Sequence, residues 1–248
     1  MDLSEVRGSR VRHPWETARA VAIERILRDA KIRPHAILDY GCGDGFTGER
    51  VLRAVGASDL VGFDIHLTDE QCSARSGGGV SYTNDWSQAE QRSFELCLLC
   101  DVIEHVADDG SLLELVRSRL GKNGHALITV PAFQALFTNH DRALKHFRRY
   151  SLSNLQRLIT SAGFELIGSG YLFASLLAGR GAAKLAEVMM PKHDSDEFGI
   201  GAWTGSPRLT RTIETVLDLD NSALLGLATR GIKLPGLSAW ALCKSPTA

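Results

Sequence analysis

Short apolar runs alternate with helical stretches through much of this 248-residue chain. The runs are AILDY at 36–40, LVGFD at 60–64, VSY at 80–82, ELCLLC at 95–100 and HALITV at 125–130. Buried strands of this kind, joined by helical crossovers, are typical of a parallel sheet with helices on both faces. We therefore expect an α/β fold, which binds its ligand at the carboxyl ends of the strands.

The remaining segments complete this pattern. Apolar residues at helical spacing predict a helix over 16–30 and another over 151–162. Ser111 is the expected N-cap of the helix that follows the fourth strand. A sixth strand is expected at 164–170 and a final strand at 238–245, with two helices around a polar, glycine-rich loop between them.

The length of the chain fits one domain with a single sizeable core. We expect this domain to span 1–248. Its parts would be an N-terminal cap helix (1–33), a cofactor-binding core (34–170), a helical insertion or lid (171–236) and the final strand (237–248).

The stretch ILDYGCGDGFTG, residues 37–48, follows the first strand and precedes a helix. Gly41, Gly43 and Gly45 let the backbone turn sharply and approach a ligand closely. A turn without a ligand would need fewer glycines. A dinucleotide site would follow G-x-G-x-x-G, but here the third glycine comes one position early.

Carboxylates beside this loop indicate which ligand it takes. Asp39 precedes the loop and Asp44 lies within it, where both would repel a pyrophosphate but suit a cation. Asp64 ends the second strand, 21 residues after Gly43, and an acid at such a position can accept both ribose hydroxyls. The site thus favours adenosine joined to a cation, which describes S-adenosylmethionine.

Taken together, ILDYGCGDG, VGFDI, NDW and CLLCDVIEHV resemble the successive motifs of class I S-adenosylmethionine-dependent methyltransferases. The resemblance covers about residues 34–170 and the last strand. It implies a Rossmann-like, seven-stranded, mostly parallel sheet with an antiparallel last strand beside the fifth, and a helical insertion between strands six and seven. RHPWETAR and VPAFQALFTNHDRALKHFRRYSLSNLQRLITSAGF also resemble a bacterial subgroup found beside glycosyltransferase or natural-product genes.

The resemblance implies a cofactor-binding role for each residue that matches these motifs. Grouped by what they would contact, these are Asp39, Gly41, Cys42 and Gly43 for the methionine half; Asp64 and Ile65 for the ribose and adenine edge; Asp85 and Trp86 for the adenine; Cys100 and Asp101 for the ammonium and methyl groups; and Trp15 with Arg19 as a cover. The segment after Asp64 is short and polar, so we expect a truncated third crossover helix.

Transfer of a methyl group to a hydroxyl is helped by a base that titrates near neutral pH, which histidine provides. His105 follows the fourth strand and His140 follows the fifth, so both are candidate catalytic residues. Asp101, at the end of the fourth strand, is the third candidate. Asp141 would either orient His140 or pair with a nearby arginine.

Asp101, Glu104 and His105 also allow a metal-binding interpretation. Ubiquinone-biosynthesis and small-RNA methyltransferases carry a similar Glu-x-x-Glu-His motif that holds a divalent metal, although many metal-free relatives also carry Glu-His-Val. A metal would need a further ligand, for which His140 and His146 are the candidates. The residues alone leave open whether a metal is used.

Composition and charge limit the partners of this chain. Its 28 basic and 29 acidic residues provide no argument for binding nucleic acid. It has no apolar run long enough to span a membrane and no apolar leader at its start, so we expect a cytoplasmic protein. The five cysteines indicate reduced core residues, with Cys97 and Cys100 on opposite faces of their strand.

We therefore expect methyl transfer to a hydroxyl of a small-molecule, sugar-linked or lipid-linked acceptor. The insertion would cover an apolar acceptor, form a dimer surface or lie on a membrane. Two other functions stay open: a nicotinamide-dependent oxidoreductase, and a catalytically silent subunit that keeps the cofactor pocket.

Overall fold

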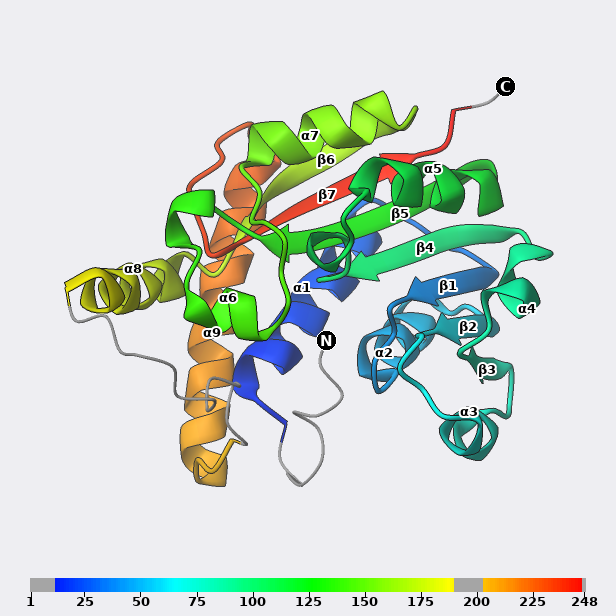
Figure 1. Ribbon diagram of the computed structural model, residues 1–248, viewed down its shortest axis with the longest axis horizontal. Helices are drawn as coiled ribbons and strands as arrows, with labels where there is room; N and C mark the ends of the chain where they lie inside the picture. The colour runs from blue at the N-terminus through cyan, green and yellow to red at the C-terminus, as the bar shows by residue number, and fades with distance from the viewer. Residues whose placement is uncertain (1–11, 190–202, 247–248) are drawn as a thin grey trace.

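The computed structural model describes residues 12–189 and 203–246, which form a seven-stranded sheet with helices on both faces (Figure 1). The strands are β1 (Ala36–Tyr40), β2 (Asp59–Phe63), β3 (Val80–Thr83), β4 (Phe94–Cys100), β5 (Leu120–Pro131), β6 (Glu165–Leu172) and β7 (Ser238–Lys244). The helices are α1 (Pro14–Asp29), α2 (Phe46–Val55), α3 (Asp69–Arg75), α4 (Trp86–Glu90), α5 (Asp109–Arg119), α6 (Asn139–Ala143), α7 (Leu152–Ser161), α8 (Ala174–Met189) and α9 (Pro207–Ala228).

The strand order is β3-β2-β1-β4-β5-β7-β6. The pairs from β3 to β5 are parallel, whereas β7 is antiparallel to both β5 and β6. The chain order reverses between β1 and β4, and such a reversal opens a crevice at the carboxyl ends of the strands. The expected Rossmann-like fold is confirmed, including the antiparallel last strand beside β5 and the helical insertion, α8 and α9, before it.

Alternate residues of β4 face two different layers, because side chains alternate across a strand. Cys97 and Leu99 pack in the layer formed with α4, α5 and α7. Leu98 and Cys100 pack in the opposite layer with α1, α2 and α9. The prediction that Cys97 and Cys100 lie on opposite faces is therefore confirmed, and all five cysteines are buried and free.

The insertion helix α9 packs beside α1, although the two are far apart in sequence (Figure 1). Asn221 of α9 is buried and joins three parts of the molecule. Its side-chain oxygen accepts from the backbone N–H of Phe173 at 2.9 Å, and its amide nitrogen lies 3.5 Å from the carbonyl oxygen of Ala18. The end of β6 is thereby attached to both α1 and α9.

Two predicted boundaries differ from the structure. The N-cap of α5 is Asp108, whose carboxylate accepts from the backbone N–H of Ser111 at 3.0 Å, so the prediction of Ser111 as the cap was wrong. The fifth strand begins at Leu120, which pairs with Phe94 ahead of a register shift, rather than at 125. The third crossover helix is short, as expected: α3 has 7 residues.

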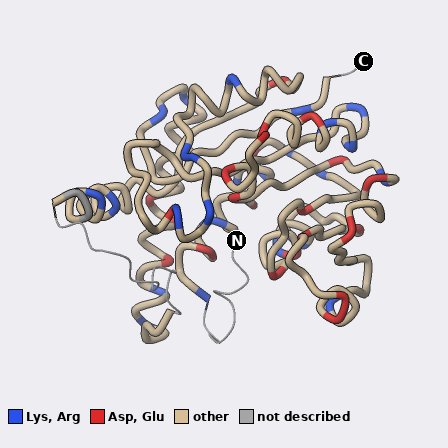
Figure 2. The backbone as a smooth tube through the Cα atoms, viewed as in Figure 1, with Lys and Arg blue, Asp and Glu red and all other residues tan. Residues whose placement is uncertain are grey.

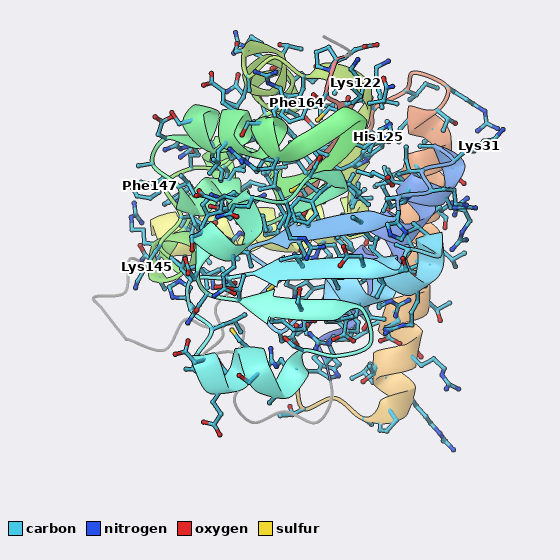
Figure 3. All side chains as sticks on the ribbon, turned by 90° about the vertical axis from the view of Figure 1, so that its right-hand side faces the viewer. Lys31, Lys122, His125, Lys145, Phe147 and Phe164 are labelled. Carbon is cyan, nitrogen blue, oxygen red and sulfur yellow. The ribbon has the colours of Figure 1, made fainter. Side chains whose placement is uncertain are left out.

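Basic and acidic residues both occur in the N-terminal and the C-terminal halves of the described chain (Figure 2). Within residues 12–189 and 203–246, no helix combines the length and apolar character needed to cross a bilayer. Figure 3 shows Lys145 and Phe147 on the side of the molecule toward which the parallel strands point, and Lys31, Lys122 and His125 on the opposite side. The first of these two sides carries the candidate site.

Candidate active site

The loop between β1 and α2 needs glycine for steric reasons. Gly41, Gly43 and Gly45 all have positive φ, at 73°, 55° and 79°. A Cβ on Gly41 would lie 2.6 Å from a methyl group of Val102, and one on Gly45 would lie 1.9 Å from the hydroxyl of Tyr82. Gly45 is the N-cap of α2, and the carboxylate of Asp44 accepts from the backbone N–H of Phe46 in the first turn at 3.2 Å. The loop is therefore a tight backbone surface at the carboxyl end of β1.

Asp64, at the end of β2, holds this loop in place. One of its carboxylate oxygens accepts from the backbone N–H of Gly43, and the other accepts from that of His66, both at 2.9 Å. The side chain is only 5% exposed, whereas that of the neighbouring Ile65 is 69% exposed. An acid and an exposed apolar side chain thus stand together at the mouth of the crevice.

Asp39 is a buried carboxylate beneath the same loop. Burial raises the pKa of Asp39 to about 7, while a hydrogen bond from the backbone of Gly48 and the charge of Arg19 act in the opposite direction. Its Oδ2 atom has no hydrogen-bond partner among the described residues. The atom lies beside α2, since a Cβ on Gly48 would be 2.5 Å from it, and a buried acceptor without a donor is costly.

Asp101 follows β4 in a strained conformation, with a φ of 56°. Its carboxylate accepts from the hydroxyl of Thr129 at 3.2 Å and forms an ion pair with Arg19 of α1. The Arg19 guanidinium lies over the ring of Trp15, 4.7 Å from its centroid. Its Nε atom is buried and has no partner among the described residues. Helix α1 thus places the guanidinium group of Arg19 at the carboxyl end of β4.

A cavity of about 340 Å³ opens beside this ion pair. Its residues come from α1, from the carboxyl ends of β4, β5 and β6, from α6 and the chain after it, from α8, and from the start of β7. They are His13, Trp15, Arg19, Asp101, Glu104, His105, Pro131, His140, Asp141, Leu144, His146, Arg149, Phe173, Leu176, Arg180, Leu237 and Ser238. A pocket with an apolar wall and a few convergent polar groups is the expected form of a small-molecule site.

Glu104, His105 and His146 meet at one side of this cavity. One ligand atom from each lies within 4.8 Å of the others. The two imidazole rings are nearly perpendicular, with their centroids 4.5 Å apart. Glu104 is fully buried, and neither of its carboxylate oxygens has a partner among the described residues. Burial raises the pKa of Glu104 to about 7. This group can hold a proton or a divalent cation next to an acceptor.

The structure brings together five of the predicted site residues at the cavity, namely Trp15, Arg19, Asp101, His105 and His140. The metal set expected from sequence is changed, because the carboxylate of Asp101 pairs with Arg19, whereas Glu104 and His105 gather with His146. Asp141 hydrogen-bonds His146 and Arg149, so it orients His146 rather than His140.

Three other predicted residues lie deeper or further away. The side chain of Cys42 packs in a small cluster with Leu67, Cys72 and Tyr82, and burial raises the pKa of its thiol well above the usual range. Cys100 is also buried, which raises the pKa of its thiol to about 12. Asp85 is exposed and caps α4. Its hydrogen bonds from Ser87 lower the pKa of its carboxyl group.

Comparison with known proteins decides the family. A family model described as a methyltransferase domain matches residues 15–169. The chain belongs to the class I S-adenosylmethionine-dependent methyltransferases. Over 206 residues this methyltransferase is 30% identical to the ubiquinone biosynthesis O-methyltransferase of Azorhizobium caulinodans, a match that covers 74% of this chain and 76% of that protein.

Solved structures share the fold of this methyltransferase at low sequence identity. An S-adenosylmethionine-dependent methyltransferase from Archaeoglobus fulgidus is 16% identical, with a TM-score of 0.53, and the match covers 92% of this chain and 96% of that one. The N-methyltransferase NodS from Bradyrhizobium japonicum, in complex with S-adenosyl-L-homocysteine, is 12% identical with a TM-score of 0.54, covering 94% of this chain and 89% of that one.

The crevice fits the cofactor of this methyltransferase family, S-adenosylmethionine. Its amino-acid end carries an ammonium and a carboxylate group. Oδ2 of Asp39 and Nε of Arg19 belong to groups of the matching charges and have no partner within residues 12–189 and 203–246, and the two side chains are close enough for Arg19 to influence the pKa of Asp39. The side-chain-free backbone from Gly41 to Gly45 lets a ligand approach closely.

Trp86 occupies a different environment from the one expected for a residue beside the adenine ring. Its indole is packed against Tyr40 and Phe63, with ring centroids 5.2 Å apart in both pairs. Its buried Nε1 atom has no partner in the described part of the chain. Trp86 therefore packs against the core, and the adenine roles of Trp86 and Asp85 stay predictions.

The cavity residues that sequence reasoning did not identify include His13, Phe173 and Arg180. His13 caps α1 and packs edge-on against Trp203, at 5.1 Å between ring centroids. Phe173 follows β6 with a φ of 64°. Arg180 reaches the cavity from α8. The positions of His13 and Arg180 depend on how the insertion packs, so no local motif could reveal them.

Proposed function

We propose that this methyltransferase transfers a methyl group to a hydroxyl of a small acceptor bound in the 340 Å³ cavity. The observation that carries the proposal is the meeting of Glu104, His105 and His146 at the wall of that cavity, beside Asp101. An O-methyltransferase is also the curated relative with 30% identity. S-adenosylmethionine, when bound, supplies a methyl group activated by a positive sulfur.

His105 is proposed as the base that takes the hydroxyl proton of the acceptor. Imidazole suits this task because it exchanges a proton near neutral pH. The buried carboxyl group of Glu104 lies beside it and favours a positive charge nearby when ionised. Asp39 and Arg19 would bind the amino-acid end of the cofactor, and Asp64 would bind its ribose. These contacts would align the methyl group with the acceptor.

The wall of the cavity indicates the kind of acceptor. The lining includes the apolar side chains of Trp15, Leu144, Phe173, Leu176 and Leu237 as well as the histidines. An acceptor that combines an apolar body with a hydroxyl would suit both kinds of side chain. Small metabolites, sugar-linked intermediates and lipid-linked intermediates all include such molecules, and a panel of acceptors must therefore contain all three.

The experiment is transfer of labelled methyl from S-adenosylmethionine to this panel, followed by mass analysis of the product. We expect a methyl ether, and we expect His105→Gln to lower kcat at least tenfold with little change in cofactor affinity. His35→Gln is the matched control, because His35 is exposed and pairs with Ser58 away from the cavity. A product methylated on nitrogen or carbon would contradict the proposal, as would equal rates for His105→Gln and His35→Gln.

A divalent cation is the second role that Glu104, His105 and His146 support. A cation held by these side chains would bind the acceptor oxygen directly and lower the pKa of its hydroxyl. Activity that survives a chelator at full rate favours the histidine base. Activity that a chelator removes and added Mg²⁺ or Zn²⁺ restores favours the cation. Binding of S-adenosylhomocysteine without turnover of any acceptor would instead support the silent-subunit alternative.

A further inference from the structure

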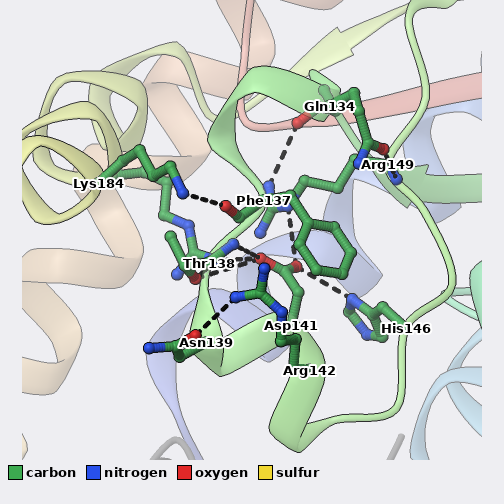
Figure 4. Close-up of polar contacts among 11 residues, drawn as sticks. Gln134, Phe137, Thr138, Asn139, Asp141, Arg142, His146, Arg149 and Lys184 are labelled. Carbon is green, nitrogen blue, oxygen red and sulfur yellow. Dashed lines mark hydrogen bonds and ion pairs between the residues drawn. The ribbon is translucent and has the colours of Figure 1, made fainter. Parts of the chain in front are cut away.

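Asp141 is the centre of a buried polar cluster on the acceptor side of the cavity (Figure 4). Its side chain is 0% exposed. Its Oδ2 atom accepts from the backbone N–H of Thr138 at 2.8 Å and from Arg180 at 2.6 Å. Its Oδ1 atom accepts from Nε of Arg149 at 2.8 Å and lies 3.1 Å from Nδ1 of His146. Each carboxylate oxygen of Asp141 therefore has at least two hydrogen-bond donors within reach.

The partners of Asp141 decide what His146 can do. Guanidinium donors reach both oxygens of Asp141, with Arg149 at 2.8 Å from Oδ1 and Arg180 at 2.6 Å from Oδ2, so the buried carboxylate is ionised. An ionised carboxylate only accepts hydrogen bonds. Nδ1 of His146 must therefore carry the proton that is donated to Asp141. In neutral His146 the other ring nitrogen, Nε2, is then the one with a free electron pair.

The tautomer of His146 matters because of the groups that lie beside its ring. The imidazole of His146 lies edge-on to that of His105, and its ligand atom is within 4.8 Å of those of His105 and Glu104. The His146 ring is almost buried, with 9% of its side chain exposed. A histidine in the other tautomer would present a donor, rather than an acceptor, at Nε2.

The carboxylate of Asp141 also binds α8 of the insertion. Arg180 belongs to α8, and its guanidinium contacts both Asp141 and the hydroxyl of Thr138, each at 2.6 Å. One turn later, Lys184 donates to the carbonyl oxygen of Phe137 at 2.7 Å. The helix that covers the acceptor side and the histidine that faces the acceptor thus share one anchor (Figure 4).

We propose that Asp141 is a positioning residue, which holds His146 in the Nδ1–H tautomer so that its Nε2 accepts a proton or a cation beside His105. This inference rests on the proposed function, because the tautomer matters for catalysis only if the reaction takes place at His105. The tautomer itself is a property of the protein alone. The two proposals can therefore fail independently.

The first measurement is nuclear magnetic resonance of the full chain labelled with ¹⁵N in its histidine rings, above the pH at which imidazoles are neutral. Long-range ¹H–¹⁵N correlations distinguish the two tautomers, and the His146 signals are assigned by their loss in His146→Gln. We expect Nδ1–H for His146 in the wild-type protein. Nε2–H would overturn the proposal, whatever the enzyme methylates. Absence of hydroxyl methylation would overturn the proposed function but not this tautomer assignment.

The second measurement compares Asp141→Asn with Asp108→Asn. Both changes replace a helix-capping carboxylate by an amide, but Asp108 is exposed and accepts from Ser111 rather than from a histidine. We expect Asp141→Asn to lower kcat at least tenfold, to leave the KM for S-adenosylmethionine within twofold, and to remove the single Nδ1–H signal pattern of His146. Equal kcat values for the two variants would overturn the proposal. If Asp141→Asn does not fold, the wild-type tautomer still decides the question.

Discussion

Replacement of Asp39 by Asn should change how the stability of this methyltransferase depends on pH. Asp39 is 2% exposed, and burial raises the pKa of its carboxyl group to about 7, against 3.8 for an unperturbed aspartate. The nearby carboxylates of Asp64 and Asp44 act in the same direction, whereas Gly48 and Arg19 oppose it. Without its cofactor, the protein must therefore either protonate this side chain or leave a charge buried.

The sign follows from proton binding in the two states. Between about pH 4 and pH 7 the folded protein keeps the Asp39 proton while the unfolded chain releases it, so stability falls as the pH rises through this range. A difference of about three pH units is equivalent to about 4 kcal/mol. Because the unfolded chain is already mostly ionised at pH 5, about 2 to 3 kcal/mol of this loss should occur between pH 5 and pH 8.

The assay is urea unfolding of wild type and Asp39→Asn without cofactor at both pH values. Asn keeps a carbonyl oxygen that can accept from Gly48, and any cost of the amide that does not depend on pH cancels in the comparison. We expect the free energy of unfolding of the wild type to fall by about 2 to 3 kcal/mol more than that of the variant. Asp29→Asn, at an exposed position of α1, controls for the change in net charge. Parallel pH dependences of wild type and Asp39→Asn would refute the reasoning.

Three further predictions concern the same crevice and cavity. Asp64→Ala should weaken binding of S-adenosylhomocysteine at least tenfold in calorimetry, because it removes the acceptor that holds the Gly43 amide as well as the proposed ribose contact; unchanged affinity would contradict this. Gly48→Ala should lower the free energy of unfolding by about 1 to 3 kcal/mol, since its Cβ would lie 2.5 Å from Oδ2 of Asp39; a urea midpoint equal to that of the wild type would show that the site relaxes freely. Glu104→Gln removes a carboxyl group with a pKa of about 7, so the rise of kcat between about pH 6 and pH 8 should become shallower; an identical profile would exclude a role for its ionisation.

The fold could be predicted because its signals are local. The strands that became β1, β2 and β4 are short apolar runs, and each is followed by a residue type that marks a strand end, such as Gly41, Asp64 and Asp101. The errors also have local causes. Asp108 and Ser111 are both good capping residues three positions apart, and only the direction of the chain before α5 selects Asp108. The extension of β5 to Leu120 depends on its pairing with Phe94, which no single segment encodes.

The sequence could predict that Asp39, the glycine loop and Asp64 come together, whereas it predicted the lining of the cavity only in part. Asp39, the glycine loop and Asp64 lie within or directly after two adjacent strands, so their spacing is enough to bring them together. His146 and Arg180 reach the cavity from a loop after β5 and from the insertion. Their positions result from tertiary contacts through Asp141. For this residue the sequence left open either the adjacent His140 or a nearby arginine as partner, and the structure pairs it with Arg149.

Asp39 and Asp141 are both buried carboxylates, but their surroundings are opposite. Asp39 is buried, one of its oxygens has no partner in the part of the chain that the structure describes, and burial raises the pKa of its carboxyl group to about 7, so a positive group nearby would stabilise its ionised form. Asp141 is buried among Arg149, Arg180 and His146, which keep it ionised and leave it no capacity for a further donor. The first carboxylate is therefore suited to bind a cationic cofactor, and the second to hold protein side chains in place. Because the Asp141 cluster includes Arg180 of α8, changes in the insertion should alter kcat through His146 as well as the affinity for the acceptor.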